Sequence, residues 1–161
     1  MSLSSAQLER LQRRLDEWEG TPYMAGQCKP GKRLEDGCGV DCVRLGDDAL
    51  QYALGLSLDP LPREAQDAAF HDPNVVFRFQ RLMLKRFRGT TLDPQTIKQE
   101  AGDILGLKLK DAAKEHHVAI VGADGVRCYH AIGAGVVWSG IGGIRASYDV
   151  LKIWRPGEFP C

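Results

Sequence analysis

The sequence predicts an α+β fold in which helices come first and an antiparallel β-sheet follows. Two amphipathic runs of helix length lie in the first third of the chain, at about residues 5–19 and 42–54. Short β-branched runs follow from about residue 103, and Asp124-Gly125 lies between two of them as a hairpin turn. Helices followed by hairpin-connected strands are typical of the α+β class.

The first helix is expected from about Ser5 to Glu19. Its apolar residues recur at helical spacing and form one stripe, made of Leu8, Leu11, Leu15 and Trp18. We interpret this stripe as part of the hydrophobic core. The Gly- and Lys-rich stretch from Cys28 to Gly37 is expected to be a loop.

The second helix is expected to begin at Asp41-Cys42. Asp is a favoured N-cap residue, and the apolar residues after Cys42 keep helical spacing until Gly55, a residue type common at helix C-termini. A cysteine at a helix start has its thiol pKa lowered, most of all beside an imidazole. Cys42 is therefore a candidate nucleophile. The alternative is a cysteine that is buried as a small hydrophobic residue.

A long segment, from about residue 57 to residue 99, separates the second helix from the strands. We expect this insert to be helical, because residues 59–65 have a helix-start pattern and residues 71–74 break it. Another helix is expected from about Asn74 to Arg88, with aromatic residues mixed among basic ones. Its basic face is interpreted as a solvated surface, with a docking surface for an acidic partner or for wall polymer as the alternative.

Strands are expected at about residues 103–109, 118–121, 126–131, 135–139 and 150–155. His117 directly precedes the second of these strands, and His130 lies in the third. If these two strands pair about Ala123-Asp124, His117 lies opposite His130. A turn at Asp124-Gly125 makes the two near-diagonal neighbours, still within side-chain reach. In both registers the imidazoles share a sheet face, so that one can act as a base and the other can orient it.

His116 is the competing candidate for the base, because strand alternation sends it to the opposite face from His117. We take His117 as the base, although the sequence leaves a swap with His116 open. Cys42, His117 and His130 then form a candidate Cys-His-His triad.

Four groups of residues follow one another along the chain: Gly20-Thr21-Pro22-Tyr23 with Gly26, then Gly39-Val40-Asp41-Cys42, then Ala101-Gly102-Asp103-Ile104-Leu105, then His117-Val118-Ala119-Ile120-Val121 with Tyr129-His130-Ala131. In composition and order they resemble the motifs of the NlpC-type cysteine peptidases. These are papain-like endopeptidases that cut the stem peptides of bacterial peptidoglycan. The cysteine precedes the histidines, which argues against the circularly permuted relatives of this family.

The resemblance implies one papain-like α+β domain over residues 1–161, with the nucleophile helix packed on the antiparallel sheet and a helical insert at about 57–99. It implies acyl transfer to Cys42, with His117 as the base and His130 as the third residue of the triad. Tyr23 and Asp41 are assigned to oxyanion and substrate binding, beside the backbone N–H of Cys42. The expected substrate bond joins D-glutamate to the diamino acid of a stem peptide. No metal and no organic cofactor is implied.

One departure from the family's pattern follows the nucleophile directly. Val43-Arg44 stand where the family usually has a small hydroxyl residue and glycine. In relatives that hydroxyl helps to shape the substrate pocket, so different substrate contacts are expected here. The departure also favours an alternative function, a phage tail assembly or structural protein with weak or lost peptidase activity. A cytosolic thiol amidase that acts on non-wall peptides is a further alternative.

Composition predicts one globular domain, because the 161 residues are 43% hydrophobic and 26% charged. The 21 Lys and Arg residues balance the 21 Asp and Glu residues, so net charge does not favour a nucleic-acid partner. No apolar run has the length that a membrane span requires.

No signal-peptide pattern follows Met1, so we expect synthesis in the cytoplasm, with a bacteriophage tail as a further location. The expected partners are the peptidoglycan stem peptide and, in the particle interpretation, phage tail proteins. The five cysteines lack a paired metal-type spacing and are expected to be free thiols.

Overall fold

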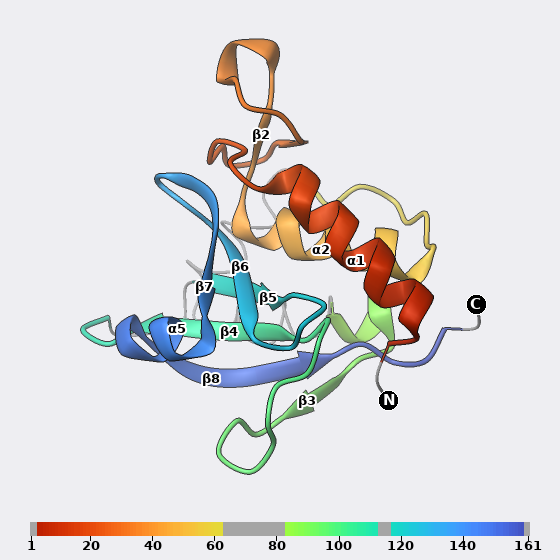
Figure 1. Ribbon diagram of the computed structural model, residues 1–161, viewed down its shortest axis with the longest axis vertical. Coiled ribbons are helices and arrows are strands. Elements are labelled where there is room, and N and C mark those ends of the chain that lie inside the picture. Colours follow the sequence, from red (N-terminus) through yellow and green to blue (C-terminus); the bar gives the residue numbers. More distant parts are fainter. Residues whose placement is uncertain (1–2, 63–82, 113–116, 160–161) are drawn as a thin grey trace.

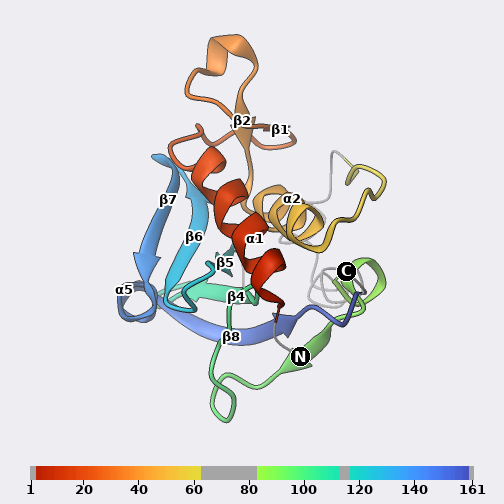
Figure 2. The ribbon, with the colours of Figure 1, turned by 45° about the vertical axis from the view of Figure 1, so that its right-hand side comes forward.

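The computed structural model describes residues 3–62, 83–112 and 117–159, and it is α+β, as the sequence predicts. Its elements are α1 (Ser5–Trp18), β1 (Cys28–Lys29), η1 (Leu34–Asp36), β2 (Gly39–Val40), α2 (Cys42–Leu54), β3 (Thr90–Leu92), β4 (Ile104–Leu109), β5 (His117–Val121), β6 (Arg127–Ile132), β7 (Gly135–Gly140), α5 (Ile141–Ser147) and β8 (Tyr148–Arg155). A six-stranded antiparallel sheet has the order β3-β8-β4-β5-β6-β7. Helices α1 and α2 lie together on one side of this sheet (Figures 1 and 2).

Both long helices begin and end where local chemistry dictates. Ser4 and Gln7 form a reciprocal capping box at the start of α1. Helix α2 has Asp41 as its N-cap and ends at Gly55, whose positive φ of 68° suits a residue without a Cβ atom. The predicted starts of both helices are confirmed, and the ends agree to within one residue.

The hairpin that joins β5 to β6 selects the second of the two registers expected from the sequence. Ile120 pairs with Tyr129 and Val121 pairs with Cys128, so the strands are centred on Asp124-Gly125. The Asp124 carboxylate accepts hydrogen bonds from the main-chain N–H groups of Val126 and Arg127, each at 2.9 Å. This turn therefore determines which residues of β6 lie beside the start of β5.

Two apolar clusters cover the two faces of the sheet. The larger joins α1 and α2 to residues such as Val118 and Ile120 of β5. The smaller contains Ala119 and Val121, together with Ile144 of α5. Because β5 is buried on both faces, alternate residues of this strand belong to different clusters. His117 has the parity of Ala119 and Val121 and so belongs to the face that α5 covers.

Several features were not predicted from the sequence. Strand β3, the two-stranded pair β1–β2 and helix α5 are additional elements. Strand β8 begins at Tyr148, two residues before the expected start. Within the insert that was expected to be helical, residues 83–87 form a helix, but residues 59–62 and Arg88 are not helical and Thr90–Leu92 form β3. The rest of the two expected insert helices lies outside the described residues.

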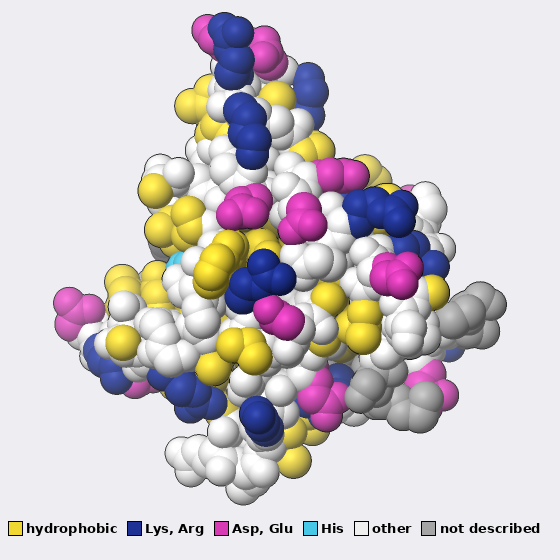
Figure 3. Space-filling view, viewed as in Figure 1, with side chains coloured by type: hydrophobic (Ala, Val, Ile, Leu, Met, Phe, Trp, Pro, Cys, Tyr) yellow, Lys and Arg dark blue, Asp and Glu magenta, His cyan; other side chains and the backbone are white. Residues whose placement is uncertain are grey.

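None of the helices in residues 3–62, 83–112 and 117–159 is long and apolar enough to cross a lipid bilayer. On the face drawn in Figure 3, acidic and basic side chains are interspersed. The four cysteines in the described ranges, Cys28, Cys38, Cys42 and Cys128, are free thiols.

Candidate active site

Cys42 is the first residue of α2, as predicted. Its side chain is buried, with 3% of the residue surface exposed. Asp41 caps the helix by accepting a hydrogen bond from the Arg44 N–H at 2.9 Å. The first main-chain N–H groups of a helix have no partner within it. In α2 the N–H groups of Cys42 and Val43 interact with the Cys42 thiol.

The predicted lowering of the Cys42 thiol pKa is wrong. Burial raises the pKa of this thiol from 9.0 to about 12, and the negative charge of Asp41 adds to the effect. Main-chain hydrogen bonds from Val118, Val43 and Cys42 itself act in the opposite direction. The helix start thus favours the thiolate, as the sequence suggested, but desolvation outweighs it.

His117 and His130 are in direct contact. The Nε2 atom of His117 lies 2.9 Å from the Nδ1 atom of His130. The ring centroids are 5.2 Å apart with the planes tilted by 53°, and both residues are buried. Burial lowers the pKa of His130. His130 is therefore neutral at pH 7, which allows its Nδ1 to accept a hydrogen bond from the Nε2–H of His117.

Strand geometry explains this contact. With the strands centred on Asp124-Gly125, position 117 is opposite position 132, so His130 is a diagonal neighbour two residues away on the same face. The near-diagonal arrangement anticipated from the sequence is the one observed. His116, the competing candidate for the base, lies outside the described residues.

The Cys42 thiol lies beside the start of β5, whose first residue is His117 and whose second is Val118. The Cys42 thiol accepts a hydrogen bond from the main chain of Val118, the residue next to His117. Val118 belongs to the same apolar cluster as Cys42. The imidazoles are largely covered by other atoms, and only a small area of histidine is visible on the face shown in Figure 3.

Tyr148 is a member of this site that the sequence did not indicate. Its ring stacks on His117, with centroids 5.5 Å apart and planes 29° apart, and it meets the edge of His130 at 6.2 Å. Burial raises the pKa of Tyr148, and a charge on Cys42 raises it further. Tyr148 was missed because the final strand was expected to begin only at Val150.

Asp41 and Arg44 form a buried ion pair that joins three segments beside Cys42. Arg44 Nη1 donates to Asp41 Oδ2 at 2.6 Å, and the Gly26 N–H donates to the same oxygen at 2.9 Å. Arg44 Nη2 also donates to the carbonyls of Leu61 and Pro62. Side-chain exposure is 0% for Asp41 and 6% for Arg44. The direct contacts of Asp41 are thus structural, and its assignment to substrate binding stays a prediction.

Tyr23 lies beside β2, the strand that leads into Asp41 and Cys42. It forms a parallel bridge with Val40, supported by a hydrogen bond from the Val40 N–H to the Pro22 carbonyl at 3.1 Å. Tyr23 is half-buried and packs against the larger apolar cluster, which contains Cys42. Its expected role in holding an oxyanion stays a prediction.

A scan against models of known protein families gives no match to this chain, and a search of curated proteins finds no similar sequence. Within the described ranges, no three His, Cys, Asp or Glu side chains come together as a metal-binding group would.

Proposed function

We propose that the chain is a papain-like cysteine peptidase that hydrolyses the stem peptides of peptidoglycan, with Cys42 as the nucleophile. The observation that carries this proposal is the buried 2.9 Å contact between His117 and His130, one residue along β5 from the main-chain contact of the Cys42 thiol. A nucleophile, a base and a residue that orients the base are the parts that such chemistry requires. The four motifs that resemble the NlpC-type family support the choice of substrate.

In the proposed acylation step the Cys42 Sγ attacks the carbonyl carbon of the scissile amide. The thiol proton passes to Nδ1 of His117, since Nε2 of that ring is hydrogen-bonded to His130. With a thiol pKa of about 12, the resting site holds a neutral thiol, so the proton moves as the substrate is attacked. His130 holds the tautomer of His117 that can accept this proton.

The oxyanion of the tetrahedral intermediate would be held by the N–H of Cys42 at the start of α2, assisted by Tyr23. His117 then gives its proton to the leaving amine, and the C–N bond breaks to leave a thioester on Cys42. Water attacks the thioester with His117 as the base. This second step restores the thiol and releases the acid.

Arg44 is compatible with this mechanism, although it departs from the family's pattern. Its side chain forms an ion pair with Asp41 and donates hydrogen bonds to the carbonyls of residues 61–62. The residue therefore supports the loop and helix start around Cys42. Substrate contacts made in relatives by the small hydroxyl residue would come from other groups in this chain.

A second candidate is a tail-associated structural protein with weak or lost activity. The observation that favours it is the burial of Cys42, which is 3% exposed and has a thiol pKa raised to about 12. Measuring turnover separates the two candidates, because peptidase activity would require the Cys42 thiol and a structural role would not.

The test is digestion of purified peptidoglycan, with mass analysis of the released fragments, by the wild-type chain beside Cys42→Ala. We expect the wild type to produce new amino termini at the diamino acid, and Cys42→Ala to produce none. Equal fragment patterns from both chains would refute the proposal. Cleavage of other peptides alone would instead favour a thiol amidase.

A further inference from the structure

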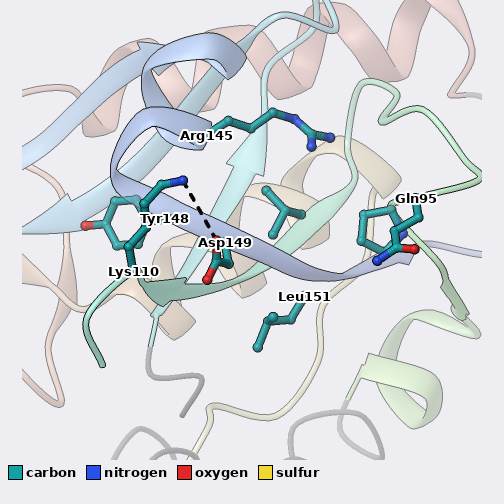
Figure 4. A pocket seen from close by; sticks show the side chains of 8 residues that line it. Gln95, Lys110, Arg145, Tyr148, Asp149 and Leu151 are labelled. Atoms are coloured by element: carbon teal, nitrogen blue, oxygen red, sulfur yellow. Dashed lines mark ion pairs between the residues drawn. The ribbon is translucent and has the colours of Figure 1, made fainter. Parts of the chain in front are cut away.

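A pocket is lined in part by Tyr148, the residue whose ring contacts both imidazoles. Its volume is about 440 Å³, and its lining includes Gln95, Lys110, Arg145, Tyr148 and Asp149. It opens where β8 runs beside α5 and the segment after β3 (Figure 4). Tyr148 both lines this pocket and stacks on His117, so one residue is shared by the pocket and the surroundings of the candidate base.

The charge of this pocket is predominantly positive. Asp149 is shared between Lys108, at 3.3 Å, and Lys110, at 3.9 Å. Arg145 forms no ion pair with any residue in the described ranges, and its side chain is exposed. In Figure 4 Arg145 extends from α5 across the pocket, while Lys110 points toward Asp149. The lining thus has two cations, Lys110 and Arg145, and one carboxylate, Asp149, an imbalance that an anionic ligand would neutralise.

We propose that this pocket binds a carboxylate of a peptide substrate through Arg145. The guanidinium presents paired N–H donors that match the two oxygens of a carboxylate. Gln95 lies across the pocket and can donate a further hydrogen bond. A stem peptide suits this site because it carries free carboxylates as well as the amide to be cut. The inference rests on the proposed function in its choice of substrate.

The binding is tested by calorimetry on the Cys42→Ala chain, which separates affinity from turnover. The probes are a synthetic stem tetrapeptide and its analogue in which every carboxylate is amidated. Loss of a charged hydrogen-bonding pair weakens binding roughly tenfold. We expect that weakening from amidation, an equal weakening from adding Arg145→Gln, and little further effect when both changes are combined. Arg33→Gln is the matched control, since it removes the same charge from the exposed η1 region and should leave the affinity unchanged.

Affinity for the stem peptide that is unaffected by Arg145→Gln would overturn the inference. So would an amidation effect of equal size with and without Arg145. If the stem peptide does not bind, acetyl-Ala-Glu-Ala-Ala with free carboxylates is the second probe. Binding of that peptide which depends on Arg145 would support the pocket and count against the wall substrate. Absence of binding by both peptides would refute the pocket, whereas the proposed function is decided separately by the digestion of peptidoglycan.

Discussion

The Nε2 atom of His117 lies 2.9 Å from the Nδ1 atom of His130, and the residues are 7% and 5% exposed. A hydrogen bond between two imidazoles requires that one ring nitrogen donates and the other accepts. Burial lowers the pKa of His130, so its neutral ring can accept a hydrogen bond, and the proposed mechanism takes His117 as the donor. This assignment leads to different expectations for the two histidines.

Replacing His117 should be the most damaging change at the imidazole pair. His117→Ala removes the proposed base, so kcat/KM for a stem tetrapeptide should fall roughly 10²- to 10⁴-fold. His130→Ala should cost less, and His130→Asn less again, because its side-chain oxygen can accept from the Nε2–H of His117. Turnover measured beside thermal melts checks this order. Wild-type turnover in His130→Ala would show that His130 is only a structural strand residue.

Cys42 should react slowly with small electrophiles at neutral pH. The thiolate fraction falls tenfold for each pH unit by which the pKa rises, and the Cys42 pKa rises from 9.0 to about 12. Alkylation by iodoacetamide at pH 7 should therefore be on the order of a thousandfold slower in the folded chain than in urea. Peptide mapping after short pulses measures both rates. Rapid labelling of folded Cys42 would indicate a thiolate held by an imidazolium ion.

The stability of the fold should decrease in mild acid because of His130. Its pKa in the folded chain is lower than its ordinary value of 6.5, so the unfolded chain binds the proton more readily. The contribution of His130 to the free energy of unfolding is therefore complete above pH 6.5 and is lost as the pH falls toward the folded pKa. Urea denaturation at a series of pH values tests this. His130→Asn should reduce the dependence, and an unchanged slope would contradict the assignment.

Breaking the buried pair between Asp41 and Arg44 should destabilise the domain. Arg44→Met leaves the Asp41 carboxylate buried without its ionic partner, which typically costs about 3–5 kcal/mol of unfolding free energy. Arg33→Met breaks the exposed pair with Glu35 and should cost less than about 1 kcal/mol. Chemical denaturation of both variants gives the comparison. Similar small losses in the two would mean that the Asp41–Arg44 pair does not stabilise the segments around the start of α2.

The ring of Tyr148 should matter more than its hydroxyl. Tyr148→Phe keeps the stacking on His117 and should keep kcat close to the wild-type value. Tyr148→Leu removes the aromatic surface and should lower kcat roughly tenfold or more through misplacement of the base. The imidazole NMR signals of His117 should broaden or shift in the leucine variant alone. An equal fall of kcat in the two variants would assign the role to the hydroxyl.

The elements around the site were predictable where the determinants are local. Asp41 and Gly55 bound α2 because an N-cap acceptor and a residue that tolerates positive φ act within one helical turn. The pairing of His117 with His130 followed from strand alternation about a turn, so the sequence limited it to two registers. Helix α5 was missed because its residues 141–147 include two glycines and lack a clear apolar stripe.

The sequence by itself determined the order of helices and strands, the cysteine at a helix start and the shared face of the two imidazoles. Tertiary structure alone decided the state of the thiol, because burial depends on how α2 packs against β5 and not on the residues next to Cys42. It also placed Tyr148 against His117 across β4, and Arg44 against carbonyls from another segment. These contacts join residues far apart in the chain, and desolvation at such contacts is a property of the packed molecule that no local pattern encodes.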